Sequence, residues 1–185
     1  MNIFTAESFY QKVTVTLIGD GPVELYINST LFLSAELSGT SIQEMFVYRD
    51  DEIFYIGDAS YQVSVEVLED PRDIDDIKYF LRDKVDLKTQ SLIYNGFSFQ
   101  GIVFSLSDKA QINWSNFPNL PQSIFPLNIL GINDEPFILQ YADVMMFYLT
   151  AVATKNSHLQ SGNVLKQQIN AMTTKQQLEQ FIDNR

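Results

Sequence analysis

The chain has 185 residues, a net charge of −11, one histidine and no cysteine. This length suits one medium domain or two small ones, and a hydrophobic fraction of 45% is ordinary for a folded protein. The absence of cysteine excludes disulfides, cysteine nucleophiles and cysteine-bearing zinc modules. The first residues lack the basic and apolar runs of a signal peptide, and the most apolar stretch, Val144 to Ala153, is too short to span a bilayer. We therefore expect no membrane partner.

The acidic charge is concentrated at the front of the chain. Residues 1–70 carry 12 acidic side chains against Lys12 and Arg49, whereas residues 71–88 are balanced and residues 89–185 have a net charge of −1. Nucleic-acid binding needs a clustered basic face, and no such cluster is present. We interpret the acidity as a means of staying soluble and expect no nucleic-acid partner.

Residues 1–69 show the alternation of β-strands. Apolar and polar residues alternate in about six short runs, such as Val13 to Leu17 and Tyr61 to Val67. Turn-forming residues separate the runs at Asp20-Gly21-Pro22, Asn28-Ser29, Ser38-Gly39, Asp50-Asp51 and Gly57-Asp58. The pattern predicts a β-rich module over 1–69, built as an antiparallel β-sandwich or small barrel.

Residues 70–89 have the signature of a connecting helix or linker. Asp70-Pro71-Arg72-Asp73 combines an Asp N-cap, Pro at the first helical position and Asp at the third. The residues Ile74, Ile77, Leu81 and Val85 then form one apolar stripe. The sequence thus places a junction between two modules here.

Residues 90–185 begin with hairpin and loop signals. Asn95-Gly96 between apolar runs predicts a hairpin over Ser91 to Phe99. Ser105 with Asp108 predicts a short helix through Ile112, and three prolines between residues 113 and 126 predict an extended arm or loop.

Two short strands and a helical hairpin are expected to complete the chain. The strands, Leu127 to Gly131 and Phe137 to Leu139, flank the turn Asn133-Asp134-Glu135-Pro136. The first helix carries the stripe Tyr141, Val144, Met145, Tyr148, Val152 and Leu159. A break at Gly162-Asn163 leads to a second apolar stretch, and Thr173 with Gln176 predicts a cap for a last helical turn. The expected fold class is therefore α+β, with C-terminal helices.

The C-terminal helices carry more apolar surface than one helical core requires. Met146, Phe147 and Leu149 lie off the stripe and are equally apolar, and a monomer seldom leaves such a contiguous patch in water. We therefore predict an interface with a partner or with other copies of the chain. Its residues are expected to be Tyr141, Met145, Met146, Phe147, Leu149, Leu165, Ile169 and Phe181.

The sequence offers no convincing catalytic or metal site. His158 has Ser157 beside it, but neighbours on one helix point in different directions, and the glycines of a nucleophile elbow are missing. The acidic run at residues 50–52 matches no calcium loop, and the scattered glycines form no phosphate loop or dinucleotide fingerprint. We expect a non-enzymatic protein without cofactor or metal, in which His158 is a polar surface residue.

Four tyrosines of the strand region, namely Tyr26, Tyr48, Tyr55 and Tyr61, are compatible with a sugar-stacking surface. Packing in the core or across strands is the preferred interpretation of these rings.

The order of elements in residues 90–185 resembles an uncharacterised domain that recurs in tail-associated proteins of tailed bacteriophages. The resemblance rests on the segments Ile93 to Phe99, Ser105 to Ile112, Asn133 to Leu139, Ala142-Asp143, Leu165 to Thr174 and Gln177-Leu178-Glu179. It implies a virion or tail-assembly context and supplies no catalytic residues. No resemblance covers residues 1–70.

Three functions follow from the sequence and the resemblance. The first is a non-catalytic structural protein of the tail apparatus, in a tail fibre, baseplate or adaptor, which contacts other phage structural proteins or copies of itself. Such a protein would be made in the host cytoplasm and would lie in the tail region of the virion. The second is a tail-fibre assembly chaperone that does not stay in the virion. The third is a carbohydrate-binding module of a receptor-recognition apparatus.

Overall fold

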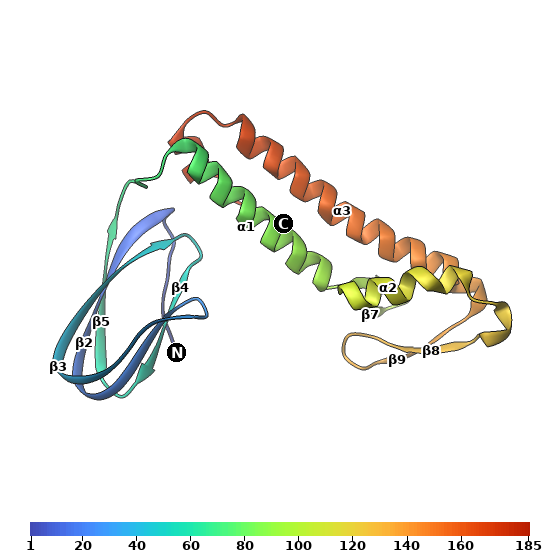
Figure 1. Cartoon of the computed structure of the whole chain (residues 1–185), viewed down its shortest axis with the longest axis horizontal. Helices are drawn as coiled ribbons and strands as arrows, with labels where there is room; N and C mark the ends of the chain where they lie inside the picture. Colours follow the sequence, from blue (N-terminus) through green and yellow to red (C-terminus); the bar gives the residue numbers. More distant parts are fainter. The chain divides into compact units, whose positions relative to one another are not determined.

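The computed structural model describes all 185 residues, which form two compact units (Figure 1). Unit 1 comprises Met1–Arg72 and unit 2 comprises Asp73–Arg185. Unit 1 is an antiparallel sheet, whereas unit 2 combines helices with two small hairpins, so the expected α+β class is confirmed. The helix that was expected as a linker over 70–89 instead spans Ile74–Tyr94 and belongs to unit 2.

One open five-stranded sheet forms unit 1. Its strands are β1 (Asn2–Thr5), β2 (Tyr10–Ile27), β3 (Thr30–Tyr48), β4 (Glu52–Gly57) and β5 (Ser60–Val67). The strand order is β1-β4-β2-β3, and β5 pairs with the first half of β2. All pairs are antiparallel and the sheet does not close, so the expected barrel is not formed.

β2 and β3 are two long bent strands, where the sequence predicted several short ones. The predicted turns at Asp20-Gly21-Pro22 and Ser38-Gly39 are wrong, because these segments face each other in one continuous ladder with Gly19 opposite Gly39. Gly21 and Gly39 have φ values of 111° and 95°, which other residues rarely adopt. The paired strands therefore bend here together instead of each turning back.

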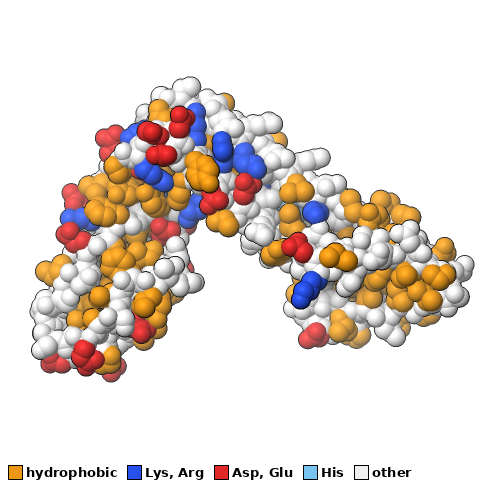
Figure 2. Space-filling model, viewed as in Figure 1, with side chains coloured by type: hydrophobic (Ala, Val, Ile, Leu, Met, Phe, Trp, Pro, Cys, Tyr) orange, Lys and Arg blue, Asp and Glu red, His pale blue; other side chains and the backbone are white.

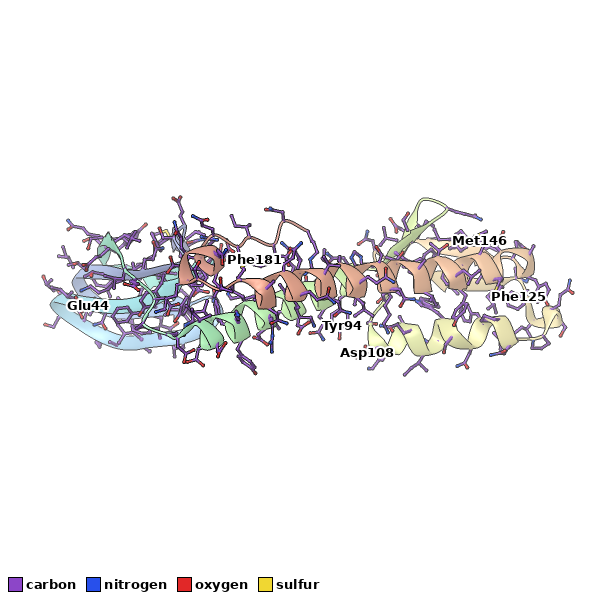
Figure 3. The ribbon with its side chains drawn as sticks, turned by 90° about the horizontal axis from the view of Figure 1, so that it is seen from above. Glu44, Tyr94, Asp108, Phe125, Met146 and Phe181 are labelled. Atoms are coloured by element: carbon purple, nitrogen blue, oxygen red, sulfur yellow. The ribbon has the colours of Figure 1, made fainter.

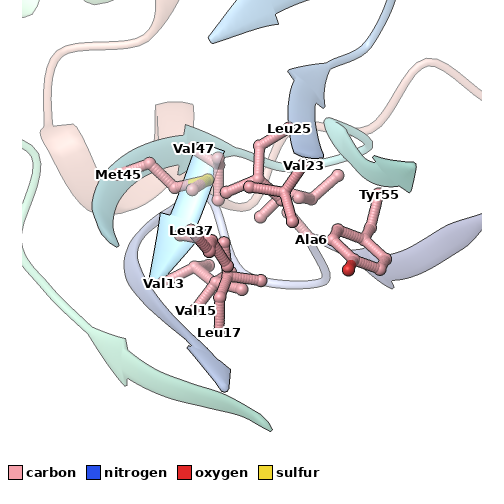
Figure 4. Packing of buried hydrophobic residues seen from close by; sticks show 11 residues of the cluster. Ala6, Val13, Val15, Leu17, Val23, Leu25, Leu37, Met45, Val47 and Tyr55 are labelled. Carbon is pink, nitrogen blue, oxygen red and sulfur yellow. The ribbon is translucent and has the colours of Figure 1, made fainter. Parts of the chain in front are cut away.

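The bend creates the core of unit 1. Val13, Val15 and Leu17 before the bend and Val23 and Leu25 after it are all fully buried, and all five lie on the same face of β2. A strand can bury one face on both sides of a bend when the two halves of its sheet fold over a shared core. That cluster also takes in residues of β3 and β4, such as Met45, Val47 and Tyr55 (Figure 4).

Two long antiparallel helices, α1 (Ile74–Tyr94) and α3 (Val144–Ala171), form the frame of unit 2 (Figures 1 and 3). Between them run the hairpin β6 (Phe97–Phe99) and β7 (Ile102–Phe104), helix α2 (Asp108–Asn116), and the hairpin β8 (Leu127–Leu130) and β9 (Pro136–Leu139). Short 3-10 turns lie at Phe117–Asn119, Gln122–Ile124 and Tyr141–Asp143, and α4 (Lys175–Glu179) follows α3. The strands predicted on either side of residues 133–136 are confirmed. The predicted arm at 113–126 is instead the end of α2 with two 3-10 turns.

Both ends of α1 differ from the prediction. The N-cap is Asp73, whose side chain accepts a hydrogen bond from the backbone N–H of Asp76 at 2.8 Å. The side chain of Asp70 is instead fully buried and paired with the guanidinium of Arg72, 2.6 Å away. At the other end, Ser91 to Tyr94 continue the helix, so Asn95-Gly96 ends a helix and is not a hairpin turn.

Gly96 explains why the chain turns where it does. Its φ is +87°, and an ideal Cβ at this position would lie 2.1 Å from the carbonyl oxygen of Phe104. Only glycine can therefore end α1 and bring β6 directly against β7. The hairpin lies downstream of the prediction, with Gln100-Gly101 at its turn.

α3 runs unbroken through Gly162, where the sequence predicted a break. The expected helical hairpin within the C-terminal segment is wrong, because α3 pairs with α1 instead. Gly162 is buried against α1, and an ideal Cβ there would lie 2.6 Å from Oγ1 of Thr89. The missing side chain permits this close approach, and the gain in packing offsets the cost of a glycine inside a helix, about 1 kcal/mol.

The last residues of the chain fold back onto the middle of this helix pair. Arg185 donates hydrogen bonds to Thr89 Oγ1 (2.9 Å), Ser161 Oγ (3.2 Å) and the carbonyl oxygen of Val85 (3.1 Å). It also forms a two-pronged ion pair with Asp183, with a shortest distance of 2.6 Å. A capping box on Thr174 and Gln177, one residue later than predicted, starts α4 and directs the chain toward α1.

Replacing Gly162 with alanine should destabilise unit 2, although alanine is the better helix former. The new methyl group would collide with Thr89 and Arg185, and we expect a loss of about 1–3 kcal/mol in the free energy of unfolding. Urea unfolding followed by circular dichroism measures this loss. Gln160→Ala, at an exposed position of the same helix, is the control, and Thr89→Ala should recover part of the loss in the double mutant. A Gly162→Ala protein as stable as the parent would contradict the close approach.

The ion pair of Asp183 predicts a defined pH dependence. Burial by itself would raise the pKa of Asp183, but hydrogen bonds from Arg185 and the charges of Arg185 and Lys88 outweigh it and hold the pKa below its usual value. A carboxyl group with a lowered pKa stabilises the fold above its unfolded pKa of about 4, and it loses this contribution as the pH falls through the folded value.

We therefore expect Asp183→Asn to lower the Tm at neutral pH, with the difference from the parent shrinking below about pH 4. Thermal unfolding over a pH series measures both effects, and Asp83→Asn, at an exposed position of α1, is the control. A Tm difference that stayed constant down to about pH 2.5 would show that Asp183 stabilises the fold by some means other than its charge.

Candidate protein–protein interface

Phe147 is the centre of an aromatic cluster in unit 2. It is fully buried, and its ring centroid lies 5.0–6.2 Å from those of Phe97, Phe99, Phe104, Trp114 and Phe117. Most of these pairs meet edge to face, which is the favourable arrangement for aromatic rings. The rings come from both strands of the first hairpin, from α2 and from the turn that follows it. Phe147 therefore belongs to the core, and its assignment to the partner interface is wrong.

Ile169 is the second interface residue that the structure corrects. It is fully buried, so it is not available to a partner. Leu165 and Phe181 are half-buried and contribute little open surface. The remaining four predicted residues, Tyr141, Met145, Met146 and Leu149, do reach solvent.

These four residues form what we call the α3 patch. Tyr141, Met145, Met146 and Leu149 keep 47%, 53%, 62% and 51% of their surface exposed. Successive helical residues are rotated by about 100°, so turning Phe147 inward places Met145, Met146 and Leu149 on the outer side of α3. Met146 lies at the end of unit 2 that also holds Phe125 (Figure 3).

The outer face of α3 changes character along its length. The same face continues beyond the α3 patch through Asn156, Gln160, Asn163 and Gln167, which are exposed and polar. The second half of this face is mainly polar, with Leu159 and Val164 as its exposed apolar residues, whereas the first turns expose three large apolar side chains close together. A helix face that contacts only solvent does not require exposed apolar residues, whereas a face that contacts another protein does.

The surroundings of the α3 patch are nearly free of charge. Between Lys109 and Lys155 the chain has no basic residue, and its only acidic residues are Asp134, Glu135 and Asp143. Figure 2 shows hydrophobic side chains gathered at this end of unit 2, while charged ones gather over α1. An apolar, charge-poor surface has the composition found at the centre of protein interfaces.

A small hollow of about 260 Å³ lies between α2 and α3. Leu106, Trp114 and Tyr148 line it, and at its rim the half-buried Lys155 donates a hydrogen bond to the amide oxygen of Gln111. The volume is below that of a typical cofactor site and suits a single side chain.

The other residues considered as metal-binding or catalytic candidates either stabilise the fold or do not lie together in one site. Asp51 is buried and accepts hydrogen bonds from the Tyr48 backbone N–H (2.8 Å) and the Asn28 amide (3.0 Å), so it joins two turns of unit 1. No group of three or more histidine, aspartate or glutamate side chains is arranged to hold a metal ion. His158 lies half-buried on α3 beside the exposed Ser157.

The four tyrosines do not form one open stacking surface. Tyr55 is buried and donates a hydrogen bond to the carbonyl oxygen of Ala59 at 2.9 Å. The guanidinium of Arg72 covers the ring of Tyr48, 4.2 Å from its centroid. The hydroxyl group of Tyr26 donates to the carboxylate of Glu24 at 2.7 Å. The ring of Tyr61 packs against that of Tyr55, with centroids 5.6 Å apart. Each of the four tyrosines therefore has a contact within unit 1.

Comparison of the chain with protein family models, curated proteins and solved structures gave no match. None of the helices is both long enough and apolar enough to cross a membrane.

Two alanine substitutions separate core from surface on α3. Phe147→Ala removes the ring at the centre of the aromatic cluster, and we expect a loss of about 3–5 kcal/mol in the free energy of unfolding. Leu149→Ala, two residues away on the exposed side, should cost less than about 0.5 kcal/mol in the monomer. Urea unfolding at low protein concentration measures both. A large loss for Leu149→Ala would show that Leu149 is packed in the core.

Proposed function

We propose that the protein is a non-catalytic structural component of the tail apparatus of a tailed bacteriophage, and that it self-associates through the α3 patch. The observation that carries the proposal is the exposure of Tyr141, Met145, Met146 and Leu149 close together, at the start of α3 and in the turn before it. No pair of nucleophile and base supports an enzymatic alternative.

The energetics favour a contact made of the α3 patch together with its neighbours. Burying a large apolar side chain contributes roughly 1.5–3 kcal/mol, and association costs at least about 4 kcal/mol in lost free motion. The four side chains are already about half-buried, so covering the rest of them contributes about 3–6 kcal/mol per copy, and a two-fold contact covers both sets. Methionine adapts its shape to a partner surface, so Met145 and Met146 suit a contact between copies.

A second copy of this chain is the partner that the charges favour. The segment between Lys109 and Lys155 has no cation to attract an acidic partner and only three scattered carboxylates to attract a basic one. Unit 2 carries 11 acidic and nine basic side chains, a net charge of −2, so copies meeting through this unit repel each other weakly.

The resemblance of residues 90–185 to the phage tail-associated domain supports the virion context. The segments that carry the resemblance include β9 and the capped α4, which are parts of unit 2. We propose that unit 2 makes the contacts of assembly in the tail region of the virion. Unit 1, in this proposal, is a sandwich-like module made by folding one sheet over itself.

The test is the double substitution Met146→Glu and Leu149→Glu. Both side chains are exposed, so we expect the fold to be kept and self-association to be lost, because four carboxylates would meet across a two-fold contact. Light scattering over a range of protein concentrations measures the oligomeric state, and circular dichroism measures the fold.

A matched control places the same charges on the polar part of the helix at the same spacing, at Gln160→Glu with Asn163→Glu, where association should persist. A parent protein that is monomeric at all concentrations would refute self-association. Mass spectrometry of purified phage particles tests the virion assignment separately, and absence of the protein from the particle would favour the assembly chaperone.

A further inference from the structure

The β3 strand leaves a long unpaired edge on unit 1. β3 is the last strand of the sheet and pairs only with β2, so the backbone groups along its other side have no strand partner. It has 19 residues, whereas the edge strands β1 and β5 have four and eight. An unpaired edge presents a row of N–H and C=O groups on which another chain can add as a strand.

β3 lacks most of the features that protect edges in other proteins. It contains no proline and no lysine. The ladder with β2 shifts register between Leu25 and Tyr26, which leaves Phe32 without an opposite residue, and the chain bends at Gly39. These irregularities disturb the first half of the strand only.

The second half of β3 is regular and partly apolar. From Thr40 to Phe46 each residue has a partner on β2 without a shift, and we call this segment the β3 edge. On its outer face Ile42 is 62% exposed and Phe46 is 54% exposed, and Phe46 stacks on Tyr10 with ring centroids 5.8 Å apart. Glu44 lies between them on the same face and pairs with Lys12 at 3.0 Å.

Charge decides which kind of chain can occupy this edge. Unit 1 carries 12 acidic side chains against Lys12, Arg49 and Arg72, a net charge of −9. Two copies joined through their β3 edges would bring two such units together and place their Glu44 side chains near each other. Like charges on neighbouring strands are destabilising, so a second copy is a poor occupant. A basic strand would instead gain from the charge of unit 1.

We propose that the β3 edge receives an extended basic segment of another protein, which adds as a further strand of the sheet. Its backbone pairs with Thr40 to Phe46, a lysine or arginine lies near Glu44, and apolar side chains lie beside Ile42 and Phe46. The partner therefore carries the pattern apolar, basic, apolar at every second residue. This surface belongs to unit 1 and is independent of the α3 patch.

The test uses the full chain and a labelled peptide of sequence Lys-Val-Thr-Lys-Thr-Val-Lys, with binding measured by fluorescence anisotropy. Ile42→Lys adds an edge lysine at an exposed position, and we expect binding about tenfold weaker, equivalent to ~1.4 kcal/mol. Ile56→Lys is the matched control: it adds the same charge to unit 1 at a position 56% exposed on β4, and it should change the affinity less than about twofold.

Two N-methylated peptides separate strand addition from simple charge attraction. One carries N-methyl groups on its odd residues and the other on its even residues, and only one set of N–H groups faces β3 in a strand pair. We expect one of them to lose binding and the other to keep it. Equal binding of both methylated peptides, an equal effect of Ile42→Lys and Ile56→Lys, or no binding of the parent peptide would each overturn the proposal. The oligomeric state of the parent is unaffected by any of these results, so the two proposals fail separately.

Discussion

The burial of Phe147 is the constraint on which the packing of unit 2 depends. Five aromatic rings from the first hairpin, α2 and the turn after it converge on this side chain. Once Phe147 faces inward, helical geometry decides that Met145, Met146 and Leu149 face outward. Packing explains the position of these three residues but not their apolar character. That character is what indicates a contact surface.

The pairing of α1 with α3 depends on Gly162 and Arg185. Gly162 lets the helices approach, and the guanidinium of Arg185 satisfies polar groups of both helices at the same level. Exposed polar contacts, such as Lys166 with Asp86 at 2.7 Å, add little individually because solvent screens them. The close approach at Gly162 and the contacts of Arg185 therefore do most of the positioning. The helix pair extends from there to the aromatic cluster that supports the α3 patch.

The two units differ in charge as well as in structure, and the difference suggests different partners. Unit 2 is nearly neutral and carries the α3 patch, which favours contacts between like copies. Unit 1 has a net charge of −9 and an open sheet edge, which disfavours like copies and favours a basic chain. A protein that joins copies of itself through one unit and binds another protein through the other would suit a structural role in a larger assembly.

Much of the fold could be predicted from local patterns in the sequence. The alternation in β2 and β5, the stripe Ile77, Leu81 and Val85, and the strands on either side of residues 133–136 all appear in the structure. These elements were predictable because their apolar residues follow the period of the structure that they form. The apolar excess around Met146 was visible because Met146, Phe147 and Leu149 depart from that period.

The glycines and the inward face of α3 were decided by tertiary structure alone. Glycine at positions 39, 96 and 162 accompanies a bend, a helix end and a helix contact, and no neighbouring residue distinguishes the three roles. The role of each glycine is set by its neighbour in space. This neighbour is the opposite strand for Gly39, Phe104 for Gly96 and Thr89 for Gly162. Phe147 is likewise as apolar as Met146, and only the convergence of distant rings sets which of the two is buried. The sequence by itself determined that apolar residues would gather on α3, and the long-range contacts determined which of them remain free for a partner.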